Sequence, residues 1–301
     1  MDGWTLLRDV RELLNEPSTS LYLTDRTTYD YLYEAACDLN MRIKGLTSTQ
    51  TITTVDGTST YSLNEDFMGL YMKDLDGNLT LKLNDGTSDF WLSWADYNSV
   101  YVANNSDEVA IPYSFTVTDT ALASRITGTA TSDGASSNSE CTLTDSTAPF
   151  TDVSVGDLVH NTTDGSHGVV VAITSTSAVI TALFDGTNND WTSSDAYIIT
   201  PRGRYSLILD PTPSTSGYSL YVPYIQKPAP VYSYYRSYRF PESYRFALTK
   251  YAAWLYKYKD REPNYGDAWF KYYEMASRTN KFSHDTTTHS KQLKVFLKRV
   301  N

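Results

Sequence analysis

The chain shows helix-type hydrophobic periodicity near its two ends and strand-type alternation between them, and this order limits the folds it can adopt. Apolar residues recur every three or four positions from Trp4 to Leu14 and from Asp25 to Lys44, which predicts two amphipathic helices. The same spacing predicts a third helix with Pro241 in its first turn and a fourth that opens at Pro263. Neither pair buries its apolar stripe alone, so we expect the helices from both ends to pack together.

The stretch between these helices is expected to form β-structure. Threonine-rich runs on either side of Asp56-Gly57 predict a β-hairpin, and the alternation around Asp76-Gly77 predicts a second one. From about Asp119 to Thr200 serine, threonine, glycine and aspartate dominate, which predicts a separate all-β module of barrel or sandwich type. Two more strands then flank a proline-rich turn, and Pro223 predicts that the second of them lies at a sheet edge or is bulged.

These patterns together predict an α+β fold. Its core would be a discontinuous helical bundle of two N-terminal and two C-terminal helices, with a small antiparallel β-section and an inserted all-β module. The predicted domain limits are 1–118 and 201–280 for the core, and 119–200 for the inserted β-barrel-like or sandwich-like module. Residues 281–301 form a separate C-terminal arm.

The net charge of −10 is distributed unevenly along the chain. Residues 201–301 carry 17 Lys and Arg against 7 Asp and Glu, whereas residues 1–200 carry 8 against 28. This polarity suits a protein whose basic end meets an acidic neighbour, although two parts with unrelated roles would also produce it. No apolar run reaches about 18 residues and the charged start lacks the features of a signal peptide, so we expect no membrane span and synthesis in the cytoplasm.

Motifs that would indicate catalysis are missing from the sequence. It contains no phosphate-binding loop, no dinucleotide-binding glycine motif, no His-Glu-x-x-His zinc motif and no Gly-x-Ser-x-Gly nucleophile elbow. Cys37 and Cys141 are interpreted as ordinary thiols, and His160 and His167 have no third ligand at metal spacing. We therefore expect no catalytic residues, no cofactor and no metal site.

Tyrosine, arginine and lysine are concentrated between Tyr221 and Pro263, a segment without histidine or cysteine. Nucleic-acid binding would use such residues for base stacking and phosphate contacts. However, helical spacing already assigns Tyr244, Tyr251 and Tyr258 to the core. Tyrosine and arginine are also enriched at the anchoring points of protein interfaces. We therefore favour an interface between subunits, with these candidate residues: Tyr232, Tyr234, Tyr235, Arg236, Tyr238 and Arg239.

Five segments together carry a resemblance to a known family: LLRDVRELLNEP, TYDYLYEAACDLNMRIKG, TQTITTVDGTSTYSLNEDF, GRYSLILDPTP and FPESYRFALTKYAAWLYKYKDREPNYGDAWFKYYEMASR. In this order they resemble the head-to-tail adaptor (connector) proteins of tailed bacteriophages, over about 200 of the 301 residues. Many adaptors lack a counterpart of the module at 119–200, so its role is not carried over from the family.

The resemblance implies a structural virion protein that forms a ring between portal and tail, usually of twelve copies, and continues the DNA channel. Its partners would be the portal protein, a tail or nozzle protein and other copies of itself, while the genomic DNA would pass through without specific binding. Its place would be the portal vertex, or neck, of the virion. We expect the module at 119–200 to project outward, toward solvent, a nozzle protein or a tail fibre.

The C-terminal arm, residues 281–301, has a net charge of +4 and interleaves basic with apolar residues. A segment destined only for solvent gains nothing from this apolar content, and the alternation suits a strand added to a neighbouring sheet or a short amphipathic turn. Because adaptors of the resembled family commonly grip the portal with their C-terminal segment, we assign these residues to portal docking: Lys291, Leu293, Lys294, Val295, Phe296, Leu297, Lys298 and Arg299.

A different function remains as an alternative. The chain would then be a surface or secreted protein whose module at 119–200 binds a glycan or a receptor. The missing signal peptide and the four expected helices weigh against this alternative.

Overall fold

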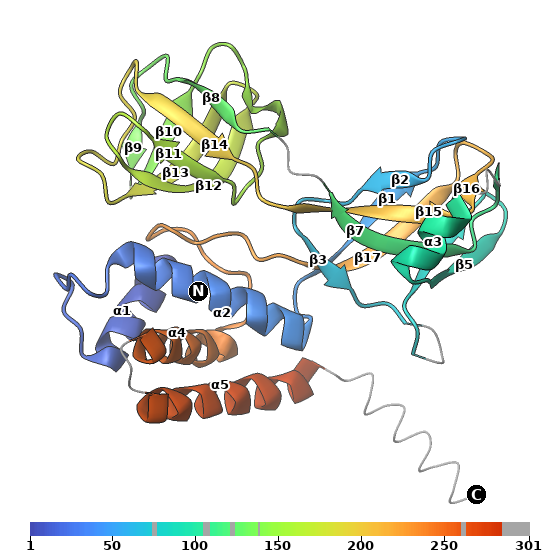
Figure 1. Ribbon diagram of the computed structural model, residues 1–301. Helices are drawn as coiled ribbons and strands as arrows, with labels where there is room; N and C mark the ends of the chain where they lie inside the picture. Colours follow the sequence, from blue (N-terminus) through green and yellow to red (C-terminus); the bar gives the residue numbers. More distant parts are fainter. Residues whose placement is uncertain (74–76, 105–108, 121–123, 138, 260–262, 285–301) are drawn as a thin grey trace, which may run out of the picture. The chain divides into compact units, whose positions relative to one another are not determined.

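The computed structural model describes residues 1–73, 77–104, 109–120, 124–137, 139–259 and 263–284 (Figure 1). Contacts between residues divide the chain into two compact units. One unit combines Met1–Gly45 with Pro230–Asn301, and the other is Leu46–Ala229. The first unit is helical, and the second is built from two large β-sheets.

The helical unit contains α1 (Gly3–Leu14), α2 (Asp25–Ile43), the short 3-10 turn η2 (Glu242–Tyr244), α4 (Arg245–Lys259) and α5 (Pro263–His284). The four helices expected from periodicity are all present. The side chains of Asp2 and Thr24 begin α1 and α2 by accepting backbone hydrogen bonds. α4 packs against α1, α2 and α5, so helices from both ends of the chain lie together.

Tyrosine hydroxyls join the two ends of the chain within this unit. Each donates a hydrogen bond from the C-terminal part to a carboxylate in the N-terminal part. The pairs are Tyr256 to Glu16 at 2.7 Å, Tyr232 to Asp30 at 2.5 Å, Tyr234 to Asp25 at 3.4 Å, Tyr251 to Glu34 at 3.5 Å, and Tyr273 to Asp38. Four tyrosines of the segment from Tyr221 to Pro263 are therefore internal partners of acidic residues in the N-terminal part of the chain.

The larger sheet of the second unit has eight strands in the order β1-β17-β4-β5-β7-β15-β2, with β3 also paired to β17. The strands are β1 (Thr47–Thr53), β2 (Thr60–Ser62), β3 (Phe67–Leu70), β4 (Thr80–Asn84), β5 (Asp89–Trp94), β7 (Ser114–Thr120), β15 (Arg204–Asp210) and β17 (Ser219–Gln226). Helix α3 (Tyr97–Asn104) packs against β7 and β15, and β6 (Val109–Ala110) pairs with β16 (Thr212–Pro213).

The two edge strands of this sheet approach each other. The side-chain amide of Gln50, on β1, donates to the carbonyl of Ser62, on β2, at 3.0 Å and accepts from the N–H of Asn64 at 2.9 Å. The sheet therefore curves around its own hydrophobic core, which consists of Ile52, Leu63, Phe67, Leu81, Leu83, Leu92, Phe115, Leu207, Leu209, Leu220, Val222 and Tyr224.

The smaller sheet has seven strands in the order β8-β14-β11-β12-β13-β10-β9. These are β8 (Ile126–Thr129), β9 (Ser136–Ser137), β10 (Glu140–Thr144), β11 (Leu158–Asn161), β12 (His167–Ser175), β13 (Ala178–Phe184) and β14 (Ala196–Thr200), with the 3-10 turn η1 (Phe150–Asp152) between β10 and β11. The N–H of Thr131, just past β8, donates to the carbonyl of Thr144 at 2.8 Å, so the sheet nearly closes into a barrel. Trp191 and Tyr197 are buried in its core.

The predicted fold class is wrong in its main feature. We expected a helical-bundle core with a small β-section, whereas most elements of the chain belong to two large sheets. The strands of the larger sheet bury their apolar residues against one another in a core of their own, so they do not depend on the helices for burial. Only the coarse α+β description is retained, and the predicted domain limits 1–118 with 201–280 and 119–200 stay predictions.

The hairpin predicted at Asp56-Gly57 is also wrong. The two flanking runs form β1 and β2, but β1 pairs with β17 and β2 pairs with β15. At the second predicted turn, Asp76 lies outside the described residues, and Lys73 and Leu79 form an antiparallel bridge on either side of it.

Candidate interaction surface

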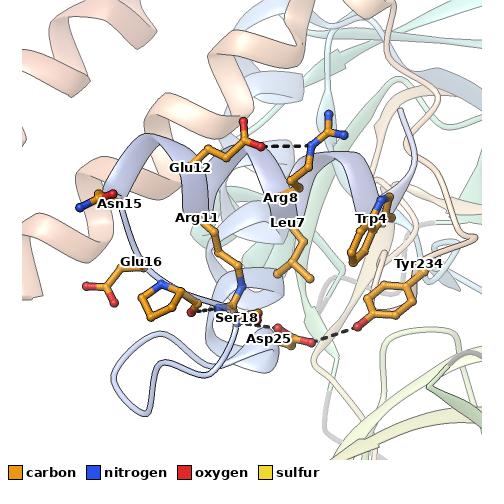
Figure 2. Close-up of a pocket in the computed structure, with 11 residues that line it drawn as sticks. Trp4, Leu7, Arg8, Arg11, Glu12, Asn15, Glu16, Ser18, Asp25 and Tyr234 are labelled. Atoms are coloured by element: carbon orange, nitrogen blue, oxygen red, sulfur yellow. Dashed lines mark hydrogen bonds and ion pairs between the residues drawn. The ribbon is translucent and has the colours of Figure 1, made fainter.

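One face of α1 forms the wall of a groove in the helical unit. Residues Trp4, Leu7, Arg8, Arg11 and Asn15 follow one another at helical spacing and line it, while Leu6 and Val10 on the other side of α1 are fully buried. The groove has a volume of about 550 Å³ (Figure 2). Its remaining lining residues, which complete the surface we call the α1 groove, are Glu12, Glu16, Pro17, Ser18, Asp25 and Tyr234.

Arg11 holds the floor of the α1 groove together. Its guanidinium is nearly buried and donates to the carboxylate of Asp25 at 2.6 Å and to the carbonyl of Leu23 at 3.0 Å. These bonds fix the loop between α1 and α2 against α1. The same loop exposes Leu21 and Tyr22 almost completely, at 90% and 82% of their surface.

The first turn of α1 is held by the segment around Tyr234. The N–H groups of Gly3 and Trp4, which have no partner inside the helix, donate to the carbonyls of Arg236 at 2.9 Å and Tyr234 at 3.4 Å. A Cβ on Gly3 would lie 2.2 Å from the carbonyl oxygen of Ser233, so only glycine permits this approach. The sequence therefore places Trp4 and Tyr234 side by side.

Trp4 and Tyr234 form the aromatic end of the α1 groove. Their rings meet edge to face with centroids 5.1 Å apart. Burial, with Asp25 close by, raises the pKa of Tyr234. Next to the groove, Asp2, Trp4, Tyr234 and Tyr235 line a second hollow, and Tyr235 exposes 74% of its surface. This end offers a half-exposed indole and two tyrosine rings to a partner.

The groove is acidic at its far end. The side chain of Glu12 is largely exposed and pairs with Arg8 at 3.6 Å (Figure 2). Glu16 accepts a hydrogen bond from the hydroxyl of Tyr256, which lowers the pKa of Glu16 below its usual range. The α1 groove thus combines aromatic and apolar contact area with ionised carboxylates.

The structure separates the predicted interface residues into two groups. Tyr232 and Tyr238 are buried, so they hold their segment in the fold. Tyr235 and Arg239 are exposed, and Tyr234 and Arg236 are half-buried, so this second group is available in part for contacts with another molecule. Whether any of the six lies between subunits stays a prediction.

The sequence did not predict that Trp4 is exposed at the surface. We placed it on the buried stripe of the first helix, but half of its surface is exposed. The reason is its position in the first turn, where the side chain extends over Tyr234 and not toward α4. Leu21 and Tyr22 gave no periodic signal because they lie in a loop.

A second exposed apolar surface lies on α4 and α5. Phe246, Tyr272 and Met275 expose 66%, 52% and 63% of their surface. The ammonium of Lys250 lies 4.9 Å from the ring centroids of both Trp269 and Tyr272, and burial lowers its pKa. We call these five residues the α4–α5 face.

The histidines and cysteines singled out in the sequence do not line the α1 groove. Among them, no group of three or more His, Cys, Asp or Glu side chains is arranged to hold a metal ion, and no helix is long and apolar enough to cross a membrane. His160 and His167 face each other across β11 and β12, with ring centroids 6.3 Å apart. Burial raises the pKa of Cys141 to about 12, so this thiol stays protonated near neutral pH.

Comparison with known families gives one match. Residues 1–134 match the model of a family described as SU10 adaptor protein, which is a phage adaptor family. The matched part includes α1, α2 and the strands from β1 to β8. It ends before α4 and α5, and it covers less than half of the chain. No protein with a curated description matches the chain.

Proposed function

We propose that this protein is a structural head-to-tail adaptor of a tailed-phage virion, which forms a ring between portal and tail and continues the DNA channel. The observation that carries the proposal is the match of residues 1–134 to a phage adaptor family. The matched residues supply α1 and most of the α1 groove, the described surface best suited to binding another protein.

Charge polarity within the helical unit supports repeated contact between copies. Residues 1–45 carry 8 Asp and Glu against 5 Lys and Arg, whereas residues 230–284 carry 10 Lys and Arg against 5 Asp and Glu. Opposite charge on the two ends of the chain favours attraction between unlike parts of neighbouring copies. We therefore assign the neighbouring copy as one partner, in a ring of twelve.

The other proposed partners follow from a place in the virion neck. These are the portal protein on one side of the ring and a tail or nozzle protein on the other, with a tail fibre as a possible ligand of the module at 119–200. The DNA passes without specific binding, because a strongly basic lining would hold its phosphates. The net charge of −10 per copy agrees with this.

The C-terminal arm is the proposed contact with the portal. Its residues Lys291 to Arg299 lie outside the described residues, so the assignment rests on the alternation of basic and apolar residues and on the resemblance to phage adaptors. Burying an apolar side chain such as Phe296 contributes roughly 1.5–3 kcal/mol, and a ring repeats this contribution in every copy.

The proposal is tested by mixing the full-length protein with assembled portal and counting bound copies by cryo-electron microscopy. We expect a ring of copies on each portal, and we expect truncation after His284 to leave the helical unit folded while abolishing portal binding. Full-length protein that stays monomeric with portal would contradict the adaptor function and favour the glycan- or receptor-binding alternative. Truncated protein that binds portal with unchanged affinity would contradict only the role of the arm.

A further inference from the structure

We infer that the α1 groove of one copy receives the α4–α5 face of the neighbouring copy. This inference rests on the proposed ring, and it names the two surfaces that meet at each contact. The groove and the face share no residue, so the contact joins unlike surfaces of identical molecules. Contacts of this kind propagate from copy to copy and close into a ring when the rotation between copies allows it.

The α4–α5 face is pre-formed for such a contact. Lys250 is held against the rings of Trp269 and Tyr272 by the packing of α4 on α5. Phe246 precedes Lys250 by one helical turn, and Met275 follows Tyr272 by nearly one turn on α5. Aromatic rings and a flexible thioether around a partly desolvated cation are typical of anchoring residues in protein interfaces.

The α1 groove is complementary to this face in shape and in charge. It is a hollow of about 550 Å³ with an aromatic end, which can receive the projecting side chains of Tyr272 and Met275. Its acidic side chains, Glu12 and Glu16, suit the ammonium of Lys250. The residues around the face extend this match, because Lys271 and Arg278 on α5 are exposed and basic.

Within one copy, the α1 groove and the α4–α5 face do not pack against each other. α1 packs on α4 through other residues, including the ion pair between Asp9 and Arg245 at 2.5 Å. Phe246, Tyr272 and Met275 remain more than half exposed in the described structure, and so does the side chain of Glu12. A second copy is therefore the occupant whose charge and apolar area fit both surfaces at once.

Cysteine cross-linking tests the inference with the full chain. In a Cys37→Ala background, where the remaining Cys141 is buried, we would introduce Glu12→Cys in the groove and Met275→Cys on the face, singly and together. A short bis-maleimide is added to concentrated protein, with and without portal. The double variant should give a ladder of oligomers, the mixed single variants should give dimers only, and each single variant alone should give none.

The outcomes separate this inference from the proposed function. Dimers from one single variant alone would indicate like surfaces in contact and would overturn the inference. Rings that assemble on portal without any Glu12→Cys to Met275→Cys product would overturn it as well, while leaving the adaptor function intact. Loss of the cross-link on truncation after His284 would make the C-terminal arm the occupant of the groove. Absence of any ring from wild-type protein and portal would count against the adaptor function itself.

A second set of variants tests the two surfaces without cross-linking, so that its result does not depend on where the cysteines are placed. Trp4→Ala in the groove and Met275→Glu on the face should each reduce assembly on portal at least tenfold at a fixed concentration. Their matched controls are Trp91→Ala and Val55→Glu, which change side chains of similar exposure on the sheet unit and should assemble as wild type does. Equal assembly by all four variants would reject the two surfaces.

Discussion

Arg11 shows how one residue shapes the candidate surface. Its stem lines the groove, and its guanidinium is hydrogen-bonded to Asp25 and to a loop carbonyl. Arg11 therefore supports the surface, but its charge is not available to a partner. Arg8, one turn earlier, is half exposed and pairs loosely with Glu12. Two arginines on the same face of one helix therefore have different roles, because the side chain of Arg11 is buried and that of Arg8 is not.

The contrast predicts different costs for removing each arginine. Arg11→Met keeps the apolar stem but removes the hydrogen bonds that Arg11 donates to Asp25 and to the carbonyls of Leu23 and Pro17. We therefore expect it to lower the free energy of unfolding by about 1.5–3 kcal/mol. Arg8→Met should cost no more than about 0.5 kcal/mol. Urea unfolding followed by the helical circular dichroism signal measures both, and equal losses would contradict this account of Arg11.

At the scale of elements, the helices could be predicted from the sequence and the strand pairings could not. A helix is specified by neighbours three and four positions away, and α1 and α2 begin and end within a residue of their predicted limits. β1 instead pairs with β17, more than 160 residues away, and the local Asp56-Gly57 signal did not decide its partner. Burial of Ile52 against the sheet core outweighed the turn preference.

Pro223 illustrates the same limit. We expected its strand to lie at a sheet edge or to be bulged. The edge is wrong, because β17 lies inside the sheet, between β1 and β4, but the pairing of β17 with β3 does shift in register between Ile225 and Gln226. On the side away from β1, β17 pairs with β4 up to Tyr221 and with β3 from Tyr224 onward. The proline therefore lies at the change of partner, where the ladder is already interrupted.

The Trp4 side of α1 depends on the segment around Tyr234, and Gly3 controls how closely this segment approaches. Gly3→Ala should push this segment away and destabilise the helical unit by about 1–3 kcal/mol, because its Cβ would meet a backbone oxygen. Gly266→Ala in α5 is the matched control: its nearest neighbour would be an ordinary 3.5 Å contact, so we expect a gain of about 0.5–1 kcal/mol. Thermal unfolding of the two variants should shift in opposite directions. Shifts of the same sign would refute the role given to Gly3.

At the scale of the whole molecule, the chain leaves the larger sheet for the smaller one and returns to it at two residues that lie side by side. Thr120 at the end of β7 and Arg204 at the start of β15 are partners in the same ladder. The candidate site lies in the helical unit, so the smaller sheet contributes nothing to it. Composition predicted a separate β-module at 119–200, whose limits stay a prediction. The sequence held no signal for the surface area that each sheet buries within itself.

Replacing residues 121–203 with Asn-Gly should therefore leave a folded protein. The two-residue turn would join β7 to β15 as a hairpin, and the core of the larger sheet would keep all its residues. We expect native helical content and unchanged cross-linking between Glu12→Cys and Met275→Cys. Aggregated or unfolded product would show that the smaller sheet is needed for folding of the rest.

The same attachment governs how the protein responds to force. A pull on the smaller sheet would draw β7 and β15 along their lengths together, and these two strands are bonded to each other over seven residue pairs. Backbone hydrogen bonds run across the strands and not along them. The bonds that join β7 to β5 and β15 to β2 would therefore bear the load at the same time, not one after another. The bonds around the insertion point would thus be loaded in shear and would resist separation together.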